Sequence, residues 1–166
     1  MSRFYPTTTC NSVTQITRPM LERLGVKALI LDVDNTLTTH NNPLPQGEIL
    51  EWLQNMHAQN ISMVLVSNNR SRRVSAFAKK LGLDYTANAM KPLTHGFRKT
   101  AGKLGLAPQE IAVIGDQIFT DVWGGNRFGA VTILTRPISL EGGAFFRLKR
   151  QVELRILRKY RQERGR

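Results

Sequence analysis

The sequence predicts an α/β protein with a three-layer Rossmann-like fold: a mainly parallel sheet, helices on both faces and no large cap domain. Apolar runs of strand length alternate with amphipathic stretches of helix length. The strand-like runs are almost continuously apolar, which is typical of strands buried on both faces. A length of 166 residues suits one compact domain. We therefore expect a single domain over residues 1–166, with an irregular N-terminal arm over about 1–15 and a basic helix over about 145–162.

The first half of the chain supplies the start of this alternation. Thr17 and Pro19 are typical of a helix start, and Gly25 of a helix end. Residues 26–31 are apolar and lead into Asp32, as expected of a buried strand. The same reasoning predicts a helix around 49–56, a strand over 61–66 and a helix over 70–81 that stops at Gly82.

The second half continues the alternation. It predicts a short strand over 85–87, a helix from Pro92 to Leu104, a strand over 111–114, a helix from Thr120 to Phe128 and a strand over 130–134. In folds of this kind the ligand lies beyond the carboxyl ends of the strands. Polar residues that follow these strands are therefore the candidates for a functional site.

Composition excludes several classes of protein. The single cysteine, Cys10, cannot form an intramolecular disulfide or a cysteine-based zinc site. No apolar run approaches the roughly 18 residues that span a bilayer, and the first ten residues contain no signal-peptide core. We expect a cytoplasmic protein, with peripheral attachment to the inner membrane surface as a possible addition.

The net charge of +12 is concentrated at the C-terminus, where residues 147–166 hold nine Lys and Arg against two Glu. Such a segment favours an acidic partner: an anionic membrane surface, a phosphorylated substrate or a nucleic acid, with the nucleic acid the weaker expectation. Apolar residues form one helical stripe along the predicted basic helix. The stripe could lie on an anionic membrane, but we favour packing on the sheet, with the basic face outside. Its members are Phe145, Leu148, Val152, Ile156 and Tyr160.

Two carboxylates follow the first buried strand. Asp32 and Asp34 are two residues apart, so they point to the same side as they leave the strand. Close carboxylates repel, which separates their proton affinities. One can then act as an ionised nucleophile toward phosphorus while the other protonates the leaving oxygen. The alternative is a simple turn, because Asp, Asn and Thr are common turn residues.

Two further acids follow a later strand. Asp116 is the third carboxylate expected at this sheet edge, and a cluster of hard oxygen ligands suits Mg²⁺. Asp121 falls at the start of the next predicted helix. It could bind the metal or support a ligand of the metal, or it could simply cap the helix.

Phosphate-binding candidates follow the other two strands. The hydroxyl of Ser67 and the backbone N–H groups from Asn68 onward could hold phosphate oxygens, although a Ser here could equally form a turn. Lys91 precedes Pro92 at a predicted helix start, where a cation is locally unfavourable. Lys91 therefore either pairs with an anion or is an exposed loop lysine.

Together these motifs resemble those of the haloacid dehalogenase-like (HAD) phosphatase superfamily. Four motifs occur in the family's order, each at a strand end. The Ser67-Asn68-Asn69 triplet, the Gly124-Gly125-Asn126 segment and the basic C-terminal helix look like the cap-less branch that contains the phosphatidylglycerophosphate phosphatases. The four motifs are Asp32-Val33-Asp34-Asn35-Thr36, Ser67-Asn68-Asn69, Lys91-Pro92 and Gly115-Asp116-Gln117-Ile118-Phe119-Thr120-Asp121.

The resemblance implies a role for each site residue. Asp32 would be the nucleophile and Asp34 the general acid and base. Asp116, Asp32 and the backbone carbonyl of Asp34 would bind Mg²⁺, and Asp121 would support the site. Ser67, Asn68 and Lys91 would bind and neutralise the phosphoryl group. The implied substrate is phosphatidylglycerophosphate, an anionic phospholipid.

The sequence also fits other substrates and roles. The loop over 38–45 is too short for a lid domain, and an open site suits a lipid head group or a macromolecule. A phosphatase of soluble esters or nucleic-acid ends fits the same chemistry, as does a non-catalytic binding protein on this scaffold. His40, His57 and His95 are scattered, and we assign them no role.

Overall fold

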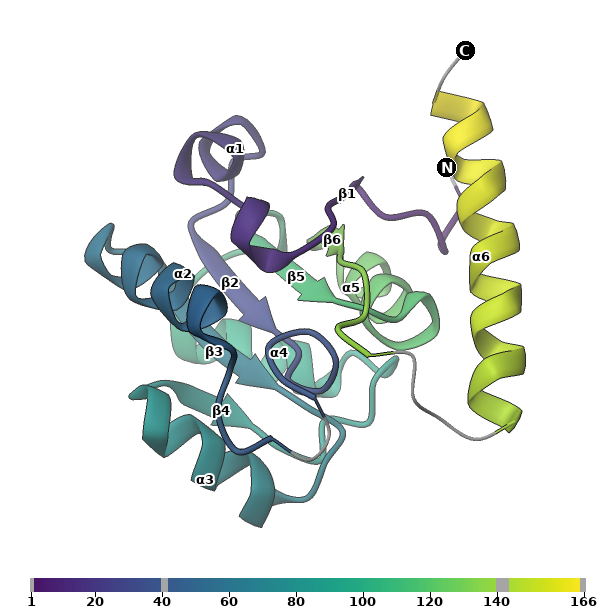
Figure 1. Cartoon of the computed structure of the whole chain (residues 1–166). Helices are drawn as coiled ribbons and strands as arrows, with labels where there is room; N and C mark the ends of the chain where they lie inside the picture. Colours follow the sequence, from purple (N-terminus) through teal and green to yellow (C-terminus); the bar gives the residue numbers. More distant parts are fainter. Residues whose placement is uncertain (1, 40–41, 140–143, 165–166) are drawn as a thin grey trace.

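The computed structural model of the chain describes residues 2–39, 42–139 and 144–164. Within these ranges six strands form one sheet, in the order β1-β6-β5-β2-β3-β4, and every pairing is parallel (Figure 1). This arrangement confirms the predicted α/β Rossmann-like fold. The strands are β1 (Thr8–Thr9), β2 (Ala28–Leu31), β3 (Ser62–Val66), β4 (Asp84–Thr86), β5 (Ile111–Gly115) and β6 (Val131–Leu134).

Helices connect successive strands and cover both faces of the sheet. Most lie where the apolar periodicity of the sequence predicts them. The α-helices are α1 (Arg18–Arg23), α2 (Gly47–Ala58), α3 (Ser71–Leu81), α4 (His95–Leu104), α5 (Trp123–Phe128) and α6 (Ala144–Arg164). Shorter helical turns are η1 (Val13–Gln15), η2 (Pro108–Glu110) and the π-helical turn η3 (Ile118–Val122).

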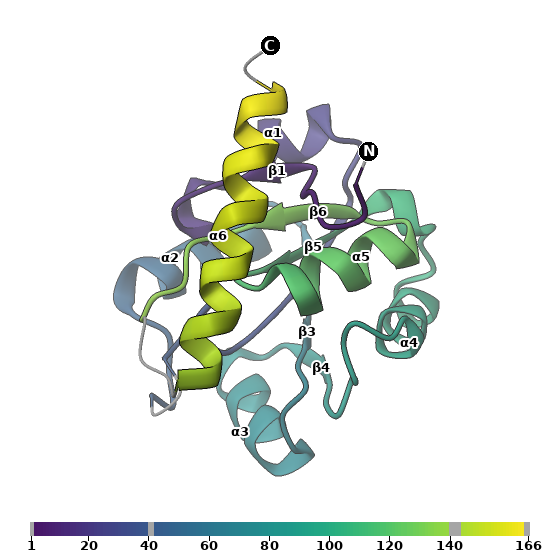
Figure 2. The ribbon, with the colours of Figure 1, turned by 90° about the vertical axis from the view of Figure 1, so that its right-hand side faces the viewer.

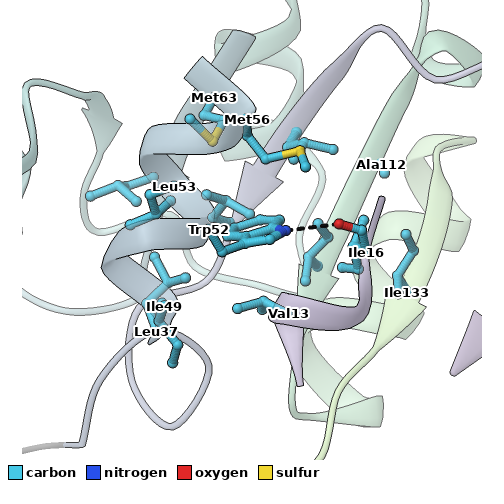
Figure 3. Packing of buried hydrophobic residues seen from close by; sticks show 14 of the residues in the cluster. Val13, Ile16, Leu37, Ile49, Trp52, Leu53, Met56, Met63, Ala112 and Ile133 are labelled. Atoms are coloured by element: carbon cyan, nitrogen blue, oxygen red, sulfur yellow. Dashed lines mark hydrogen bonds between the residues drawn. The ribbon is translucent and has the colours of Figure 1, made fainter. Parts of the chain in front are cut away.

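The alternation of side chains along β2 divides the core into two layers. Leu29 and Leu31 pack in the cluster that includes α2 and α3, whereas Ile30 packs in the cluster that includes α4. Trp52 lies at the centre of the first layer, and its indole Nε1 donates to the carbonyl oxygen of Ile16 at 2.8 Å (Figure 3). Both faces of β2 are thus buried, and this packing holds the carboxyl end of the strand, where Asp32 follows, in a fixed position.

The N-terminal arm is more ordered than its sequence predicts. Thr8 and Thr9 form β1, which pairs with β6 at the edge of the sheet, and residues 13–15 form a helical turn. The side-chain amide of Asn126 donates to the carbonyl oxygens of Arg3 and Tyr5, at 2.8 and 2.9 Å. A two-residue strand carries no periodicity, so only its pairing with distant residues defines it.

The helix predicted from Pro92 begins three residues later, at His95. Residues 91–94 are instead a turn, in which the N–H of Leu93 donates to the carbonyl oxygen of Met90 at 2.9 Å. Lys91 therefore does not lie in the first turn of a helix. The predicted electrostatic reason for an anion beside Lys91 was therefore wrong, because no helix begins there, although Lys91 does contact anions, as described below.

The buried face of the basic helix α6 keeps only part of the predicted apolar stripe. Leu148 is 61% exposed and Val152 is 38% exposed, whereas Glu153 and Tyr160 are buried. Ile156 packs with residues of η3 and β6. The side chain of Phe145 lies outside the described part of the structure. Polar contacts described below rotate α6 away from its apolar stripe, and it runs along the side of the molecule that carries β6 and α5 (Figure 2).

Candidate active site

Three buried carboxylates meet at the carboxyl edge of the sheet. Asp32 follows β2, and its N–H donates to Ile114 of the neighbouring β5 at 2.9 Å. Asp116 follows β5, and Asp121 lies in η3. A carboxylate oxygen from each of the three acids lies within 4.8 Å of those of the other two. Asp32 and Asp116 are 84 positions apart in the chain, and the adjacent parallel strands β2 and β5 bring them together.

Lys91 is the cation that faces this cluster. Its Nζ lies 2.6 Å from Oδ1 of Asp32 and 2.6 Å from Oδ1 of Asp121, and the lysine is buried. The side chain of Asn68 fixes the backbone of Lys91, accepting from its N–H at 2.7 Å and donating to its carbonyl oxygen at 3.1 Å. Of the two interpretations of Lys91, the structure supports the one in which the lysine pairs with an anion and not the exposed loop lysine.

Burial sets the protonation of the cluster. It raises the pKa of Asp32 to about 6, although the charge of Lys91 acts in the opposite direction. Burial likewise raises the pKa of Asp116 to about 7 against the opposing effect of Arg150. For Lys91, burial lowers the pKa, but Asp121 and Asp32 raise it more, so the lysine stays charged. Burial therefore makes the ionised forms of Asp32 and Asp116 costly, and a bound cation would stabilise them.

This donor set fits a hard divalent cation. Three carboxylates supply oxygen ligands of the kind that Mg²⁺ prefers. Oδ1 of Asp116 is buried and has no hydrogen-bond partner among the described residues. A buried polar atom without a partner is costly, and a cation beside it would remove that cost.

A pocket of about 200 Å³ opens beside the acids. Asp32, Asp34, Asn35, Ser67, Asn68, Asn69, Lys91, Gln117 and Thr120 line it. Asp34 contacts the side chains of Asn69 and Arg73. The hydroxyl of Ser67 accepts from the N–H of Asn69 at 3.1 Å, so Ser67 belongs to a turn and also faces the pocket. The predicted phosphate-binding residues thus share one cavity with the predicted nucleophile.

Asp121 combines the two roles that its position allows. Its Oδ2 accepts from the N–H of Gln117, the residue before η3, at 3.2 Å, as the acidic residue of a capping box does. Its Oδ1 contacts Lys91. The capping bond fixes the carboxylate within the turn that follows β5, and this places it against the lysine.

Sequence reasoning missed three charged residues next to the site. Arg73 pairs with Asp34, Arg150 of α6 pairs with Asp116, and Glu153 of α6 pairs with Arg150. One signal was available for Glu153, because it is one of only two acids in the basic segment 147–166. Of the histidines, His57 and His95 are exposed, and His40 lies outside the described residues.

The fold and this cluster of acids, lysine and serine at strand ends define a HAD-type phosphatase. The chain belongs to the mitochondrial PGP phosphatase family, whose model matches residues 1–139. This match covers the sheet, the four motifs and the pocket, and it ends before α6. The predicted class of enzyme is confirmed.

Similar proteins agree with this assignment. A probable phosphatase of Bacillus subtilis, YqeG, is 38% identical over 93% of this chain and 90% of its own length. A phosphatidylglycerophosphate phosphatase of Arabidopsis thaliana is 28% identical over 85% of this chain, but only 43% of that longer protein is covered. Among solved structures, the YrbI phosphatase of Haemophilus influenzae matches with a TM-score of 0.54 and 16% identity, over 68% of this chain and 69% of its own. This last likeness concerns the fold.

Proposed function

We propose that the chain is an Mg²⁺-dependent phosphomonoesterase that works through an aspartyl-phosphate on Asp32 and converts phosphatidylglycerophosphate to phosphatidylglycerol. The observation that carries the chemistry is the buried Lys91, which lines the polar pocket and lies 2.6 Å from both Asp32 and Asp121. The family and the plant relative support the substrate.

Asp32 is the proposed nucleophile. Its carboxylate lies in the pocket, and Thr36 donates to its Oδ2 at 3.3 Å while Lys91 holds Oδ1. These contacts orient the carboxylate for attack on phosphorus. As the Asp32 oxygen bonds to phosphorus, the bond from phosphorus to the leaving oxygen breaks and its electron pair stays on that oxygen.

Asp34 is the proposed general acid and base. It lines the same pocket, two residues beyond the nucleophile. Its proton passes to the leaving oxygen, which departs as an alcohol. Water then attacks phosphorus, gives a proton back to Asp34 and displaces the Asp32 oxygen. Inorganic phosphate leaves and both carboxyl groups return to their starting state.

Charge neutralisation is assigned to the remaining residues of the cluster. Lys91 and the hydroxyl of Ser67 would bind the oxygens of the phosphoryl group. Asp32, Asp116 and the Asp34 carbonyl would hold Mg²⁺, with Asp121 supporting them. When bound, Mg²⁺ supplies electrostatic stabilisation of the phosphoryl oxygens. Positioning and neutralisation together provide most of the catalysis expected for phosphoryl transfer.

The outward face of α6 is the proposed lipid contact. It carries two strongly exposed leucines, Leu148 and Leu154, together with exposed cations. In the described residues no helix is long and apolar enough to cross a bilayer. Attraction of an amphipathic basic face to anionic lipid would instead bring the open pocket to a surface-bound substrate. The exposed cations of this face are Arg155, Arg158 and Lys159.

The test is Mg²⁺-dependent phosphate release from phosphatidylglycerophosphate in mixed micelles, beside a panel of soluble phosphomonoesters and 5′-phosphorylated oligonucleotides. Asp32→Asn is the control variant. We expect lipid turnover that disappears in the variant. Turnover of soluble esters or oligonucleotides alone would keep the mechanism and reject the lipid substrate. A protein without turnover of any of these substrates would point to a binding role.

A further inference from the structure

The C-terminal helix α6 is attached directly to the loop that carries Asp116. Glu153, although it lies in the most basic segment of the chain, is only 2% exposed. Its Oε1 accepts from the N–H of Ile118 at 2.9 Å and from that of Phe119 at 3.4 Å. These are the first N–H groups of η3, so a carboxylate from α6 caps the turn that also contains Asp121.

Arg150, one helical turn before Glu153, binds Asp116 directly. Its Nη1 donates to the Asp116 carbonyl oxygen at 2.5 Å and to Oε2 of Glu153 at 2.9 Å. Its Nη2 pairs with Oδ2 of Asp116. One guanidinium thereby fixes both the backbone and the carboxylate of a proposed metal ligand.

This arrangement leaves one oxygen of Asp116 available. Oδ2 is held by Arg150, whereas Oδ1 is buried and has no hydrogen-bond partner among the described residues. Ligating carboxylates in proteins are commonly oriented by hydrogen bonds to their second oxygen, and loss of such partners typically weakens metal binding 10–100-fold. The contacts of Arg150 have this form.

The local charge is also consistent with Arg150 orienting Asp116 and does not favour repulsion of Mg²⁺ by Arg150. Glu153 lies within 2.9 Å of Arg150 and both are largely buried, so together they form a pair of zero net charge beside the metal site. A buried ion pair contributes little net stability compared with apolar residues of similar size. Because the pair lies next to Asp116, it can orient that carboxylate.

We propose that Arg150 and Glu153 of α6 are positioning residues that hold Asp116 and η3 in the geometry that binds Mg²⁺. The inference rests on the proposed function, because it assumes the Mg²⁺ site. It makes α6 part of the active site, beyond its proposed contact with lipid. The opposite arrangement, in which Arg150 takes the place of the cation and must be displaced by it, predicts the opposite sign in the test below.

The test is the Mg²⁺ affinity of the full chain measured by titration calorimetry, without substrate. We expect Arg150→Met and Glu153→Gln each to weaken Mg²⁺ binding about 10–100-fold. The Mg²⁺ affinity of Arg150→Lys should lie between those of wild type and Arg150→Met. An ammonium can contact Asp116, but it cannot contact the Asp116 carbonyl oxygen, the Asp116 carboxylate and Glu153 at once. The matched control is Arg161→Met, an exposed arginine on the same helix, which should bind Mg²⁺ like wild type.

Steady-state kinetics on a soluble ester supply a second measurement. For Arg150→Lys, saturating Mg²⁺ should restore most of kcat. Its circular dichroism and melting temperature without Mg²⁺ should match those of wild type, which separates weaker Mg²⁺ binding from a general loss of fold. Should Arg150→Met not fold, the affinities of Arg150→Lys and Glu153→Gln decide the matter.

Two results overturn the inference: wild-type affinity in folded Arg150→Lys and Glu153→Gln, or tighter binding in Arg150 variants. A wild-type chain that neither binds Mg²⁺ nor releases phosphate rejects the proposed function instead, and the inference with it.

Discussion

Nζ of Lys91 lies 2.6 Å from Oδ1 of Asp32, and both side chains are buried. The two residues are 59 positions apart in the chain, so the turn after Met90 and the end of β2 must both be formed before they can meet. Because the lysine also contacts Asp121, one cation balances two buried carboxylates. The stability and the chemistry of the site depend on the same contact.

Replacing Lys91 should therefore destabilise the protein strongly. Lys91→Met leaves the carboxylates of Asp32 and Asp121 buried without their cation, and breaking a buried pair in this way costs about 3–5 kcal/mol. Urea unfolding at pH 8 measures this loss. The control is Lys99→Met, an exposed lysine on α4, which should change stability by less than about 0.5 kcal/mol. Equal effects of the two substitutions would contradict the role of Lys91.

Gly115 should tolerate no side chain. A Cβ there would lie 2.3 Å from Cγ of Asp121, so Gly115→Ala must displace the carboxylate that contacts Lys91. We expect loss of phosphatase activity and a lower melting temperature. Gly102→Ala in α4 is the control, because its Cβ meets no atom within 4 Å, and it should gain roughly 0.5–1 kcal/mol from helix propensity. Full activity in Gly115→Ala would mean that Asp121 can move without consequence.

Most of the sheet and the acid cluster could be predicted from the sequence. The apolar runs that end at Asp32, Ser67 and Asp116 identify buried strands, and parallel strands bring their carboxyl ends together. The period of the helices and glycines such as Gly82, which ends α3 in a left-handed conformation, identifies the helices. These features depend on local patterns, which one sequence contains.

Other features depend on contacts between distant residues. β1 exists because Thr8 and Thr9 pair with β6, and α4 begins late because residues 91–94 form a turn. The apolar stripe on α6 is misleading, since Glu153 and Arg150 turn toward η3 and Asp116 and leave Leu148 exposed. Helical periodicity identifies the most apolar face of a helix. It cannot predict that Glu153 and Arg150 form buried polar contacts with residues far away in the chain.

Stability should depend on pH in a way that Mg²⁺ changes. The pKa of Asp116 is raised from 3.8 to about 7 in the folded protein, so between these values the folded state binds more protons than the unfolded state. Its contribution to stability is complete below about pH 4 and is lost as the pH rises through 7. Asp32, with its pKa raised to about 6, acts in the same direction.

Melting temperatures at pH 5 and pH 8, with and without Mg²⁺, measure this effect. Without Mg²⁺ we expect lower stability at pH 8. Mg²⁺ should raise the melting temperature more at pH 8 than at pH 5, because protons compete with it for the carboxylates. Asp116→Asn should reduce both the pH dependence and the response to Mg²⁺. The same response to Mg²⁺ at both pH values would be evidence against binding by these acids.

The proton donated by Asp34 should matter most for poor leaving groups. Asp34→Asn cannot protonate an alkoxide, so hydrolysis of an alkyl phosphate should fall by about 10²–10⁴-fold. The kcat/KM for p-nitrophenyl phosphate should fall much less, because a nitrophenolate leaves without a proton and the later attack of water does not enter kcat/KM. The ratio of kcat/KM for the two substrates in wild type and variant isolates this role from binding. Asp32→Asn, which removes the nucleophile, should lose activity toward both substrates alike, and an equal loss in Asp34→Asn would assign Asp34 to binding or positioning.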